Sequence, residues 1–357
     1  MKEYLPIITD TDRETVLGLI ERYKTLIWTD RYYTPGDFEI VCPLEYLDLL
    51  AIDRYIDVDG FQGVIEKIVI QTDAESGATI TASGRTLNSI LGRRVVTMQT
   101  EFNSTLSHAV DRLVRYNFID VYRPALGSAR EVPGLLVGDV SVGDDIDYSA
   151  QYTGDNVLEA VQNLCEEHGL GFRLTRCRHT SYSGVALVFD LYAGTDHSFG
   201  QTENEVYVFS EELENLSALT YAEDHSTTIN EVIVMGEGEG YNRARVWAGD
   251  DGTTHSGLAR YEGYCDARDL SKTSESGTIS DEDYYAQLSS RGEAMLTTFD
   301  SVFTSSGDVG RYPDIAVGDL VGIVSNKTGL KTNARLVELI HSVSETGAYH
   351  VYPTFGS

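Results

Sequence analysis

Two hairpin-like stretches, one in the first third of the chain and one at its end, share a residue pattern. Val-Ile-Glu-Lys-Ile at 64–68 is followed by a Ser-Gly-Ala turn and then by Gly84. Leu-Val-Glu-Leu-Ile at 336–340 is followed by a Thr-Gly-Ala turn and then by Gly356. Each reads as an apolar strand with one glutamate, a glycine turn and a second strand that ends in glycine. This repeat predicts two related β-barrel domains, with the rest of the chain inserted between their parts.

Strand signals also dominate elsewhere. Residues 79–84 and 337–343 alternate apolar with polar side chains, which is the period of a half-buried strand. Residues 186–192 and 229–235 are rich in β-branched and aromatic residues, which favour strands. The chain has 33 glycines, many at the ends of these runs, and only 7 prolines. Turns are therefore plentiful, and no proline-rich linker marks a domain boundary.

Three segments instead show helical spacing of apolar residues: 104–116, 156–168 and 281–299. Their predicted N-caps are Ser104, Asp155 and Ser280, and Gly169 is the predicted C′ residue of the second helix. The predicted apolar stripe of the third helix is Tyr285, Leu288, Met295 and Phe299. Few helices among many strands predict a β-rich α+β fold.

We predict three domains from these elements. Residues 1–97 together with 206–236 form a first β-barrel domain. Residues 98–205 form an inserted α/β domain. Residues 237–357 form a second β-barrel domain with one long helix. A length of 357 residues suits two or three domains.

The charge balance limits the possible partners. The chain has 27 basic and 56 acidic residues, a formal net charge of −29, so most of its surface repels nucleic acid and anionic lipid. A dispersed excess of acids suits a well-solvated surface, or a passage through which DNA slides without sticking. No stretch is apolar enough for a signal core or a membrane segment. Cys42, Cys165, Cys177 and Cys265 are scattered, which predicts buried thiols in a reducing cytoplasm.

No motif in the sequence indicates catalysis or a cofactor. Cys165 and His168 share a helix face, but they offer two soft ligands where zinc usually needs three or four. The glycine-rich run at 236–240 contains two glutamates, which would repel a phosphate. The acidic clusters at 143–147 and 249–252 lack the spacing of a calcium loop, although a structural calcium stays an open alternative. We therefore predict no catalytic, cofactor-binding or metal-ligating residues, and His341 is predicted to be a core histidine.

The order of short motifs along the chain resembles a known family. Residues 81–96 run Thr-Ala-Ser-Gly-Arg-Thr-Leu-Asn-Ser-Ile-Leu-Gly-Arg-Arg-Val-Val, which is similar to a signature of siphovirus tail-hub proteins. Further similar segments, in order, are 31–40, 208–216, 230–237, 257–262, 288–292, 317–321 and 351–356. The chain departs from the family pattern at 180–197 and at Ala259, where an acidic residue is expected. The motif positions that we single out as structural are Gly36, Asp37, Phe38, Gly84, Leu91, Arg93, Arg94, Phe209, Asn215, Gly318, Asp319 and Gly356.

The resemblance implies a hub at the distal end of a phage tail, similar to the hubs of contractile-tail baseplates. In that fold two barrels per subunit arrange three subunits into a pseudo-hexameric ring around the DNA ejection channel. The implied partners are other copies of the chain in a homotrimer, the distal tail or tail tube protein, the tape measure protein, and a spike, fibre or receptor-binding protein. DNA is implied only in transit. The implied location is the virion tail tip, after assembly in the host cytoplasm, and the inserted residues 98–205 are expected to face the tip.

Two other functions are open at this stage. A receptor-binding or carbohydrate-binding tail-tip protein would need exposed aromatic platforms. Only Trp28 and Trp247 are available, and both are predicted to lie buried in strands. A wall-degrading hydrolase would need a nucleophile or zinc set, and the sequence shows neither.

Overall fold

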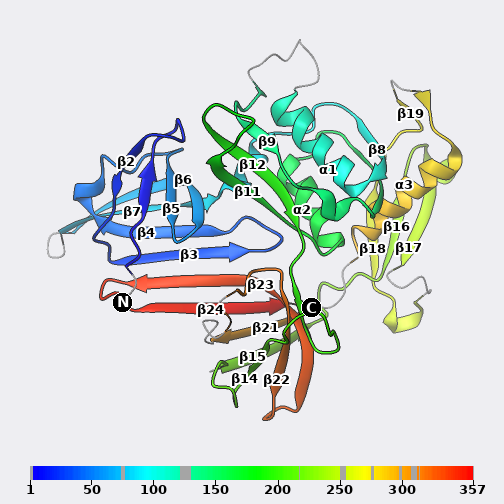
Figure 1. Cartoon of the computed structure of the whole chain (residues 1–357). Coiled ribbons are helices and arrows are strands. Elements are labelled where there is room, and N and C mark those ends of the chain that lie inside the picture. Colours follow the sequence, from blue (N-terminus) through cyan, green and yellow to red (C-terminus); the bar gives the residue numbers. More distant parts are fainter. Residues whose placement is uncertain are drawn as a thin grey trace.

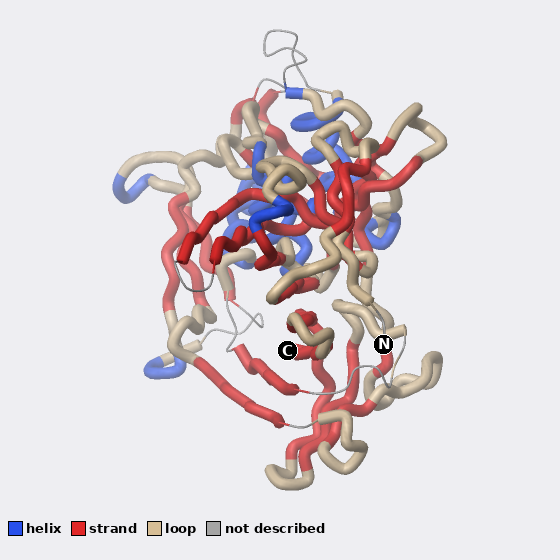
Figure 2. Tube along the Cα trace, turned by 90° about the vertical axis from the view of Figure 1, so that its left-hand side faces the viewer, coloured by secondary structure: helices blue, strands red, loops and turns tan. Residues whose placement is uncertain are grey.

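The computed structural model describes residues 3–73, 77–120, 130–216, 218–249, 255–274, 277–296, 300–306, 312 and 314–356. Its elements form one large sheet, an inserted α/β unit, and a small sheet covered by a helix (Figure 1). Most of the helical segments gather around the inserted strands, as the view turned by 90° shows (Figure 2). The prediction of a β-rich fold with a minority of helix is confirmed.

The large sheet has 14 strands, with the order β15-β21-β24-β23-β3-β4-β7-β6-β5-β1-β2 along its main path and β13, β14 and β22 beside it. Its N-terminal strands are β1 (Ile7–Thr9), β2 (Val16–Leu19), β3 (Thr25–Arg31), β4 (Asp37–Pro43), β5 (Tyr55–Val58), β6 (Phe61–Asp73) and β7 (Gly77–Thr86). Its later strands are β13 (Asp196–His197), β14 (Val208–Ser210), β15 (Ala218–Asp224), β21 (Asp300–Ser306), β22 (Leu320–Ser325), β23 (Leu330–Ser344) and β24 (Tyr349–Gly356). The predicted strands at 79–84 and 337–343 lie within β7 and β23.

Both repeated stretches form long hairpins, β6–β7 and β23–β24, and they flank the β3–β4 hairpin in the same sheet. A bulge interrupts each hairpin close to its terminal glycine, at Glu66 in the first and at Val337 in the second. A bulge leaves one residue unpaired and bends the strand locally. The repeat seen in the sequence is therefore also a repeat of structure.

The two predicted closed barrels are not found among the described strands. Instead, β23 pairs with β3 from Glu338↔Arg31 to Ser344↔Thr25, which joins the N-terminal and C-terminal strands into one continuous open sheet. Residues 206–236 also pair differently from the predicted grouping. Within them, β14 pairs with β22 and β15 pairs with β21, and both partner strands belong to the C-terminal half.

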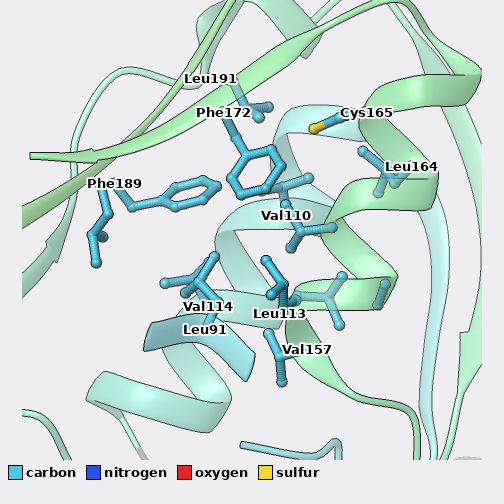
Figure 3. Close-up of a cluster of buried hydrophobic side chains, with 14 of the residues drawn as sticks. Leu91, Val110, Leu113, Val114, Val157, Leu164, Cys165, Phe172, Phe189 and Leu191 are labelled. Carbon is cyan, nitrogen blue, oxygen red and sulfur yellow. The ribbon is translucent and has the colours of Figure 1, made fainter. Parts of the chain in front are cut away.

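The inserted unit packs two helices against a two-stranded and a three-stranded sheet. Its strands are β8 (Thr100–Thr105), β9 (Leu135–Val137), β10 (Asp147–Tyr152), β11 (Gly171–Arg178) and β12 (Val185–Tyr192). Its helices are α1 (Leu106–Val114), which continues as one π turn (Arg115–Ile119), and α2 (Val157–Glu167). Side chains of both helices and of β11 and β12 form the largest buried cluster (Figure 3). This core also takes in Val64 of β6 and Leu87 and Leu91 of the segment after β7, so the inserted unit packs continuously against the first hairpin.

The two predicted caps in this unit are each one residue off. Thr105, rather than Ser104, caps α1 by accepting a hydrogen bond from the backbone of His108. Asn156, rather than Asp155, caps α2 by accepting from Leu158 and Glu159. Neighbouring polar residues can serve the same free N–H groups, so the sequence alone does not choose between them. Gly169 follows α2 with a φ of 65°, as predicted for a C′ residue.

A second unit lies beside the inserted domain, on the side away from the N-terminal strands (Figure 1). Its sheet has the order β17-β16-β18, from β16 (Glu231–Met235), β17 (Arg245–Gly249) and β18 (Glu262–Asp266), with the short strands β19 (Thr273–Ser274) and β20 (Gly277–Thr278) nearby. Helix α3 (Asp281–Glu293) covers one face, and Ser280 caps it as predicted. The predicted stripe is wrong at Tyr285, which is 40% exposed, because Tyr284 is buried in its place. Leu288 is buried as predicted, and Met295 packs against the same cluster. Phe299 lies outside the described residues.

Candidate assembly site

A single buried hydroxyl connects the main bodies of the molecule. Tyr32, which follows β3, donates to the carbonyl of Gly169 at 3.0 Å and lies 3.4 Å from that of Tyr192. Its hydroxyl also accepts from the backbone N–H of Gly194 at 3.2 Å. The Tyr32 side chain has no exposed surface, and burial raises its pKa, so it stays a protonated donor. The N-terminal sheet is thereby tied to the end of the inserted sheet where β11 begins and β12 ends.

The predicted motif residues Gly318 and Asp319 complete this junction. Gly318 has a φ of 103°, and a Cβ atom there would lie 2.3 Å from the Tyr32 ring, so only glycine fits. Arg335 stacks over the same ring at 5.3 Å and donates to the Gly318 carbonyl at 2.6 Å. The buried Asp319 carboxylate accepts from the N–H of Thr195 at 2.8 Å. We call Tyr32, Gly194, Gly318, Asp319 and Arg335 the Tyr32 junction.

A second cluster of predicted motif residues lies where the two halves of the large sheet meet. Arg31 of β3 bonds Asp37 of β4 at 2.5 Å and Glu338 of β23 at 2.7 Å. All three side chains are partly shielded from solvent, so these pairs act mainly to fix the register of three strands. A Cβ atom on Gly36 would lie 1.8 Å from the carbonyl oxygen of Thr29, which explains the glycine at that position.

Phe38 and Gly84 form one contact on the same sheet. The Phe38 ring packs edge-on against Phe61 at 6.0 Å, and Gly84 lies directly opposite Phe38 in the strand register. A Cβ atom on Gly84 would lie 1.9 Å from the Val64 carbonyl oxygen and 3.0 Å from the Phe38 ring. Gly356, the corresponding glycine of the second hairpin, is less crowded, with the Val337 side chain at 3.1 Å.

The remaining motif residues support cores and connections. Leu91 is fully buried in the cluster of the inserted unit, and Arg93 pairs with Asp53 at 2.7 Å. Arg94 stacks on Phe118 at 5.7 Å. Phe209 is buried against Phe355, while the Asn215 side-chain amide closes the turn after β14 through Ser210 and Val208. The motif set therefore does not converge on one pocket, and each member has a local packing or pairing role.

Potential metal ligands are scattered, and three of the four cysteines are buried, in the part of the chain that the structure describes. Among the described residues, no group of three or more His, Cys, Asp or Glu side chains could hold a metal ion. Burial raises the pKa of the Cys42 thiol to about 11 and that of Cys165 to about 12, so neither is a ready nucleophile. His341 is mostly buried, stacks on Trp28 at 4.8 Å and bonds the Tyr349 hydroxyl at 2.7 Å. None of the described helices is long and apolar enough to cross a membrane.

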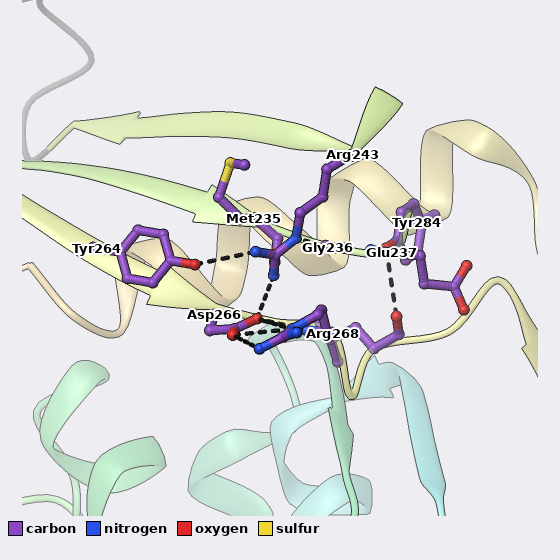
Figure 4. Close-up of polar contacts among 9 residues, drawn as sticks. Met235, Gly236, Glu237, Arg243, Tyr264, Asp266, Arg268 and Tyr284 are labelled. Atoms are coloured by element: carbon purple, nitrogen blue, oxygen red, sulfur yellow. Dashed lines mark hydrogen bonds and ion pairs between the residues drawn. The ribbon is translucent and has the colours of Figure 1, made fainter. Parts of the chain in front are cut away.

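Arg243 links the end of β16 to β18 in the small sheet. It donates to the Gly236 carbonyl at 2.7 Å and the Tyr264 hydroxyl at 3.1 Å, and it also bonds the carboxylate of Asp266 (Figure 4). Hydrogen bonds from Arg268 and Arg243 hold the pKa of Asp266 at about 2. The glycine-rich run at 236–240 is thus held by an arginine at its start.

The outer face of the small sheet carries exposed aromatic residues that the sequence did not predict. Trp247, predicted to be buried, is 47% exposed there, and Tyr264 is 56% exposed. Both lie opposite Ile233 of β16, which places the three side chains in one row across the sheet. Arg260 stacks on Trp247 at 4.6 Å. Helix α3 packs on the opposite face of this sheet, so Trp247 and Tyr264 remain exposed to solvent. Trp28 is buried, as predicted.

Solved structures that share this arrangement of strands and helices include bacterial and prophage tail proteins. The tail protein from Neisseria meningitidis MC58 superposes with a TM-score of 0.58, at 13% identity over 100% of this chain and 97% of that one. The prophage tail protein gp18 from Listeria monocytogenes EGD-e gives 0.56, at 11% identity over 99% and 94%. The 43 kDa tail protein of prophage MuSo2 from Shewanella oneidensis gives 0.56, at 13% identity over 99% and 97%. The fold is thus that of phage tail proteins.

The sequence itself assigns the family. Residues 8–357 match the profile of the Siphovirus ReqiPepy6 Gp37-like proteins, so the chain belongs to that family. No curated protein sequence matches the chain significantly. The resemblance to siphovirus tail proteins noted from the motifs is therefore confirmed.

Proposed function

We propose that this chain is a structural tail-hub protein that forms a trimeric ring at the distal end of the tail. The ring joins the tail tube or distal tail protein, with the tape measure protein, to a spike, fibre or receptor-binding assembly, and it encloses the DNA ejection channel. The family and the shared fold support a structural, non-enzymatic role in a siphovirus tail or baseplate.

The observation that carries this proposal is the repeated hairpin. Three chains with two equivalent hairpins each supply six equivalent positions, which suits a partner with sixfold symmetry on one side and a threefold assembly on the other. In this proposal, the two halves of the large sheet take the place of the two predicted barrel domains. Residues 98–205 are the inserted domain that faces the tip. The Tyr32 junction connects that domain to both halves of the sheet.

The charge of the chain suits a channel. A net charge of −29 repels DNA over distances of about 8–10 Å at physiological salt, which keeps a transiting genome from adhering. The proposal requires that acidic residues line the ring. A neutral or basic lining in a structure of the assembled ring would contradict this part of it.

Light scattering of the purified chain, alone and with the distal tail protein of the same particle, tests the proposal. We expect a trimer, or a monomer that becomes three copies on the partner ring. A chain that stays monomeric with and without that partner would refute the hub function. A negative-stain image of the complex gives the position of the ring independently of its mass.

The exposed row of Trp247 and Tyr264 favours a second candidate, a receptor-binding or carbohydrate-binding tail-tip protein. Sugar rings stack on exposed aromatic faces, and this row offers two beside Arg260. Sedimentation with purified host wall polysaccharide tests it, with Trp247→Ala as the variant. Binding that the variant loses, from a chain that ignores the tail protein, would replace the hub proposal.

A further inference from the structure

The two halves of the large sheet have the same arrangement of paired strands. In the C-terminal half, β22 pairs with the first part of β23, up to Arg335, and β3 pairs with its second part, from Glu338 to Ser344. In the N-terminal half, β5 pairs with the first part of β6, at 61–64. Strand β6 is thus the counterpart of β23, and β5 is the counterpart of β22.

The second part of β6 has an open edge. Within the part of the chain that the structure describes, residues 66–72 have β7 on one side and no strand on the other. Ile70 on this edge is 49% exposed. An open edge with an exposed apolar residue is a ready site for another strand. The corresponding stretch of β23 is the one that β3 occupies.

The counterpart of β3 is β15. Gly84 lies opposite Phe38, which lies opposite Trp28 on β3. The two hairpins correspond at their bulges, so Phe355, which pairs with Leu336 just before the bulge, is the counterpart of Gly84, which pairs with Ile65. Phe355 lies opposite Phe303, which lies opposite Tyr221 on β15. Trp28 and Tyr221 are therefore equivalent positions. Like the second part of β6, β15 has a neighbour on one side only, β21, among the described strands.

We propose, on the basis of the hub function, that β15 of one copy pairs antiparallel with the second part of β6 of the next copy. This contact repeats, between chains, the β23–β3 pairing found within one chain. Because the two edges differ, the contact is head-to-tail, which is the kind that closes into a ring. In Figure 1, β15 lies at the bottom and β6 at the upper left, so each copy presents its two edges on different sides.

The internal repeat also fixes the register. His341 lies opposite Trp28 within the chain. Aligning the bulges, Glu66 with Val337, makes His341 equivalent to Ile70, so Ile70 lies opposite Tyr221 of the next copy. Ile70 and Tyr221 are two large side chains that are 49% and 45% exposed in the single chain. Cross-strand pairs of aromatic and β-branched residues are favourable in antiparallel sheets.

Cysteine cross-linking tests the register. Directly opposed residues in an antiparallel pair have Cα atoms about 4.5–5.5 Å apart, which a disulfide spans. An Ile70→Cys, Tyr221→Cys double variant, mildly oxidised, is expected to run as covalent oligomers that end at the trimer. A mixture of the two single variants is expected to give dimers only. Strands β6 and β15 of one chain are seven positions apart in the sheet, roughly 34 Å along it, which excludes a bond within the chain.

A charged substitution tests the edge without cross-linking. Ile70→Lys is expected to raise the concentration at which half of the chains are assembled by about tenfold or more, because a charge on an edge strand opposes strand addition. Val16→Lys is the control, since Val16 is 62% exposed on β2, at the far end of the same sheet. We expect this control to assemble as the unmodified chain does.

The outcomes separate this inference from the proposed function. Trimers that form but do not cross-link through Ile70 and Tyr221, or that are weakened equally by the Val16 control, refute the strand pairing and leave the hub function standing. A chain that does not assemble alone or with the distal tail protein refutes both. Cross-linked trimers that the Ile70 charge weakens support both.

Discussion

Removing the hydroxyl of Tyr32 tests whether one side chain holds the bodies of the molecule together. Tyr32→Phe deletes a hydrogen bond to Gly169 and leaves the N–H of Gly194 without its acceptor. Each lost bond costs about 1 kcal/mol net, and an unsatisfied buried N–H costs about 1–3 kcal/mol. Because both glycines are only half-buried and water can reach them in part, we expect a loss of about 2 kcal/mol in the free energy of unfolding.

Urea unfolding, followed by far-ultraviolet circular dichroism and by tryptophan fluorescence, measures this loss. The matched control is Tyr33→Phe, on the next residue, whose ring contacts that of Tyr32 but has no hydrogen bond in the described part of the chain. We expect the control to change stability by less than about 0.5 kcal/mol. A loss below that limit in Tyr32→Phe, or an equal loss in both variants, would refute the role of the hydroxyl.

Three further outcomes are expected. Gly84→Ala destabilises the chain by about 3 kcal/mol or prevents folding, since its Cβ would meet the Val64 carbonyl at 1.9 Å, and urea unfolding beside Ser83→Ala checks this. Of the four cysteines, Cys177 reacts first with a thiol reagent, because the other three are buried with raised pKa values; labelling followed by peptide mapping would contradict this if another reacts faster. Burial and then Glu293 raise the pKa of Glu167 from 4.5 to about 7, so the folded state binds its proton more tightly than the unfolded state. Stability therefore falls as pH rises from about 4.5 to about 7, and Glu167→Gln flattens that part of a melting-temperature profile.

Local features could be predicted well from the sequence. Strand positions follow from alternation with period two, and the Ser280 cap and the Gly169 stop follow from helix-end chemistry. The errors at Ser104 and Asp155 are one residue in size, because adjacent polar residues compete for the same N–H groups. The error at Tyr285 has a similar cause, because either of two adjacent tyrosines could face the sheet. Tyr284 is the buried one, since it lies on the same side of the helix as Leu288 and Gly292.

Strand partners could not be predicted from the pattern. Alternation fixes which face of a strand is buried, but it does not say which strand lies beside it. The pairing of β23 with β3 joins residues from opposite ends of the chain, and it converts two predicted barrels into one open sheet. Trp247 was misplaced for a related reason, because burial of the outer face of its sheet depends on a neighbour that sequence alone does not reveal. Of the motif positions singled out as structural, Gly318 and Asp319 belong to the Tyr32 junction, and Tyr32 itself lies in the similar segment 31–40.

The pairing of β23 with β3 has a consequence for the kinetics of assembly. Since both strands belong to one chain, this joint forms at a rate and with a stability that do not depend on protein concentration. The proposed ring would then alternate between two kinds of strand pairing. The β23–β3 pairing forms when one chain folds, and the β15–β6 pairing forms when two chains associate. In the proposed ring, three joints between chains close six positions, whereas six separate subunits would need six such joints.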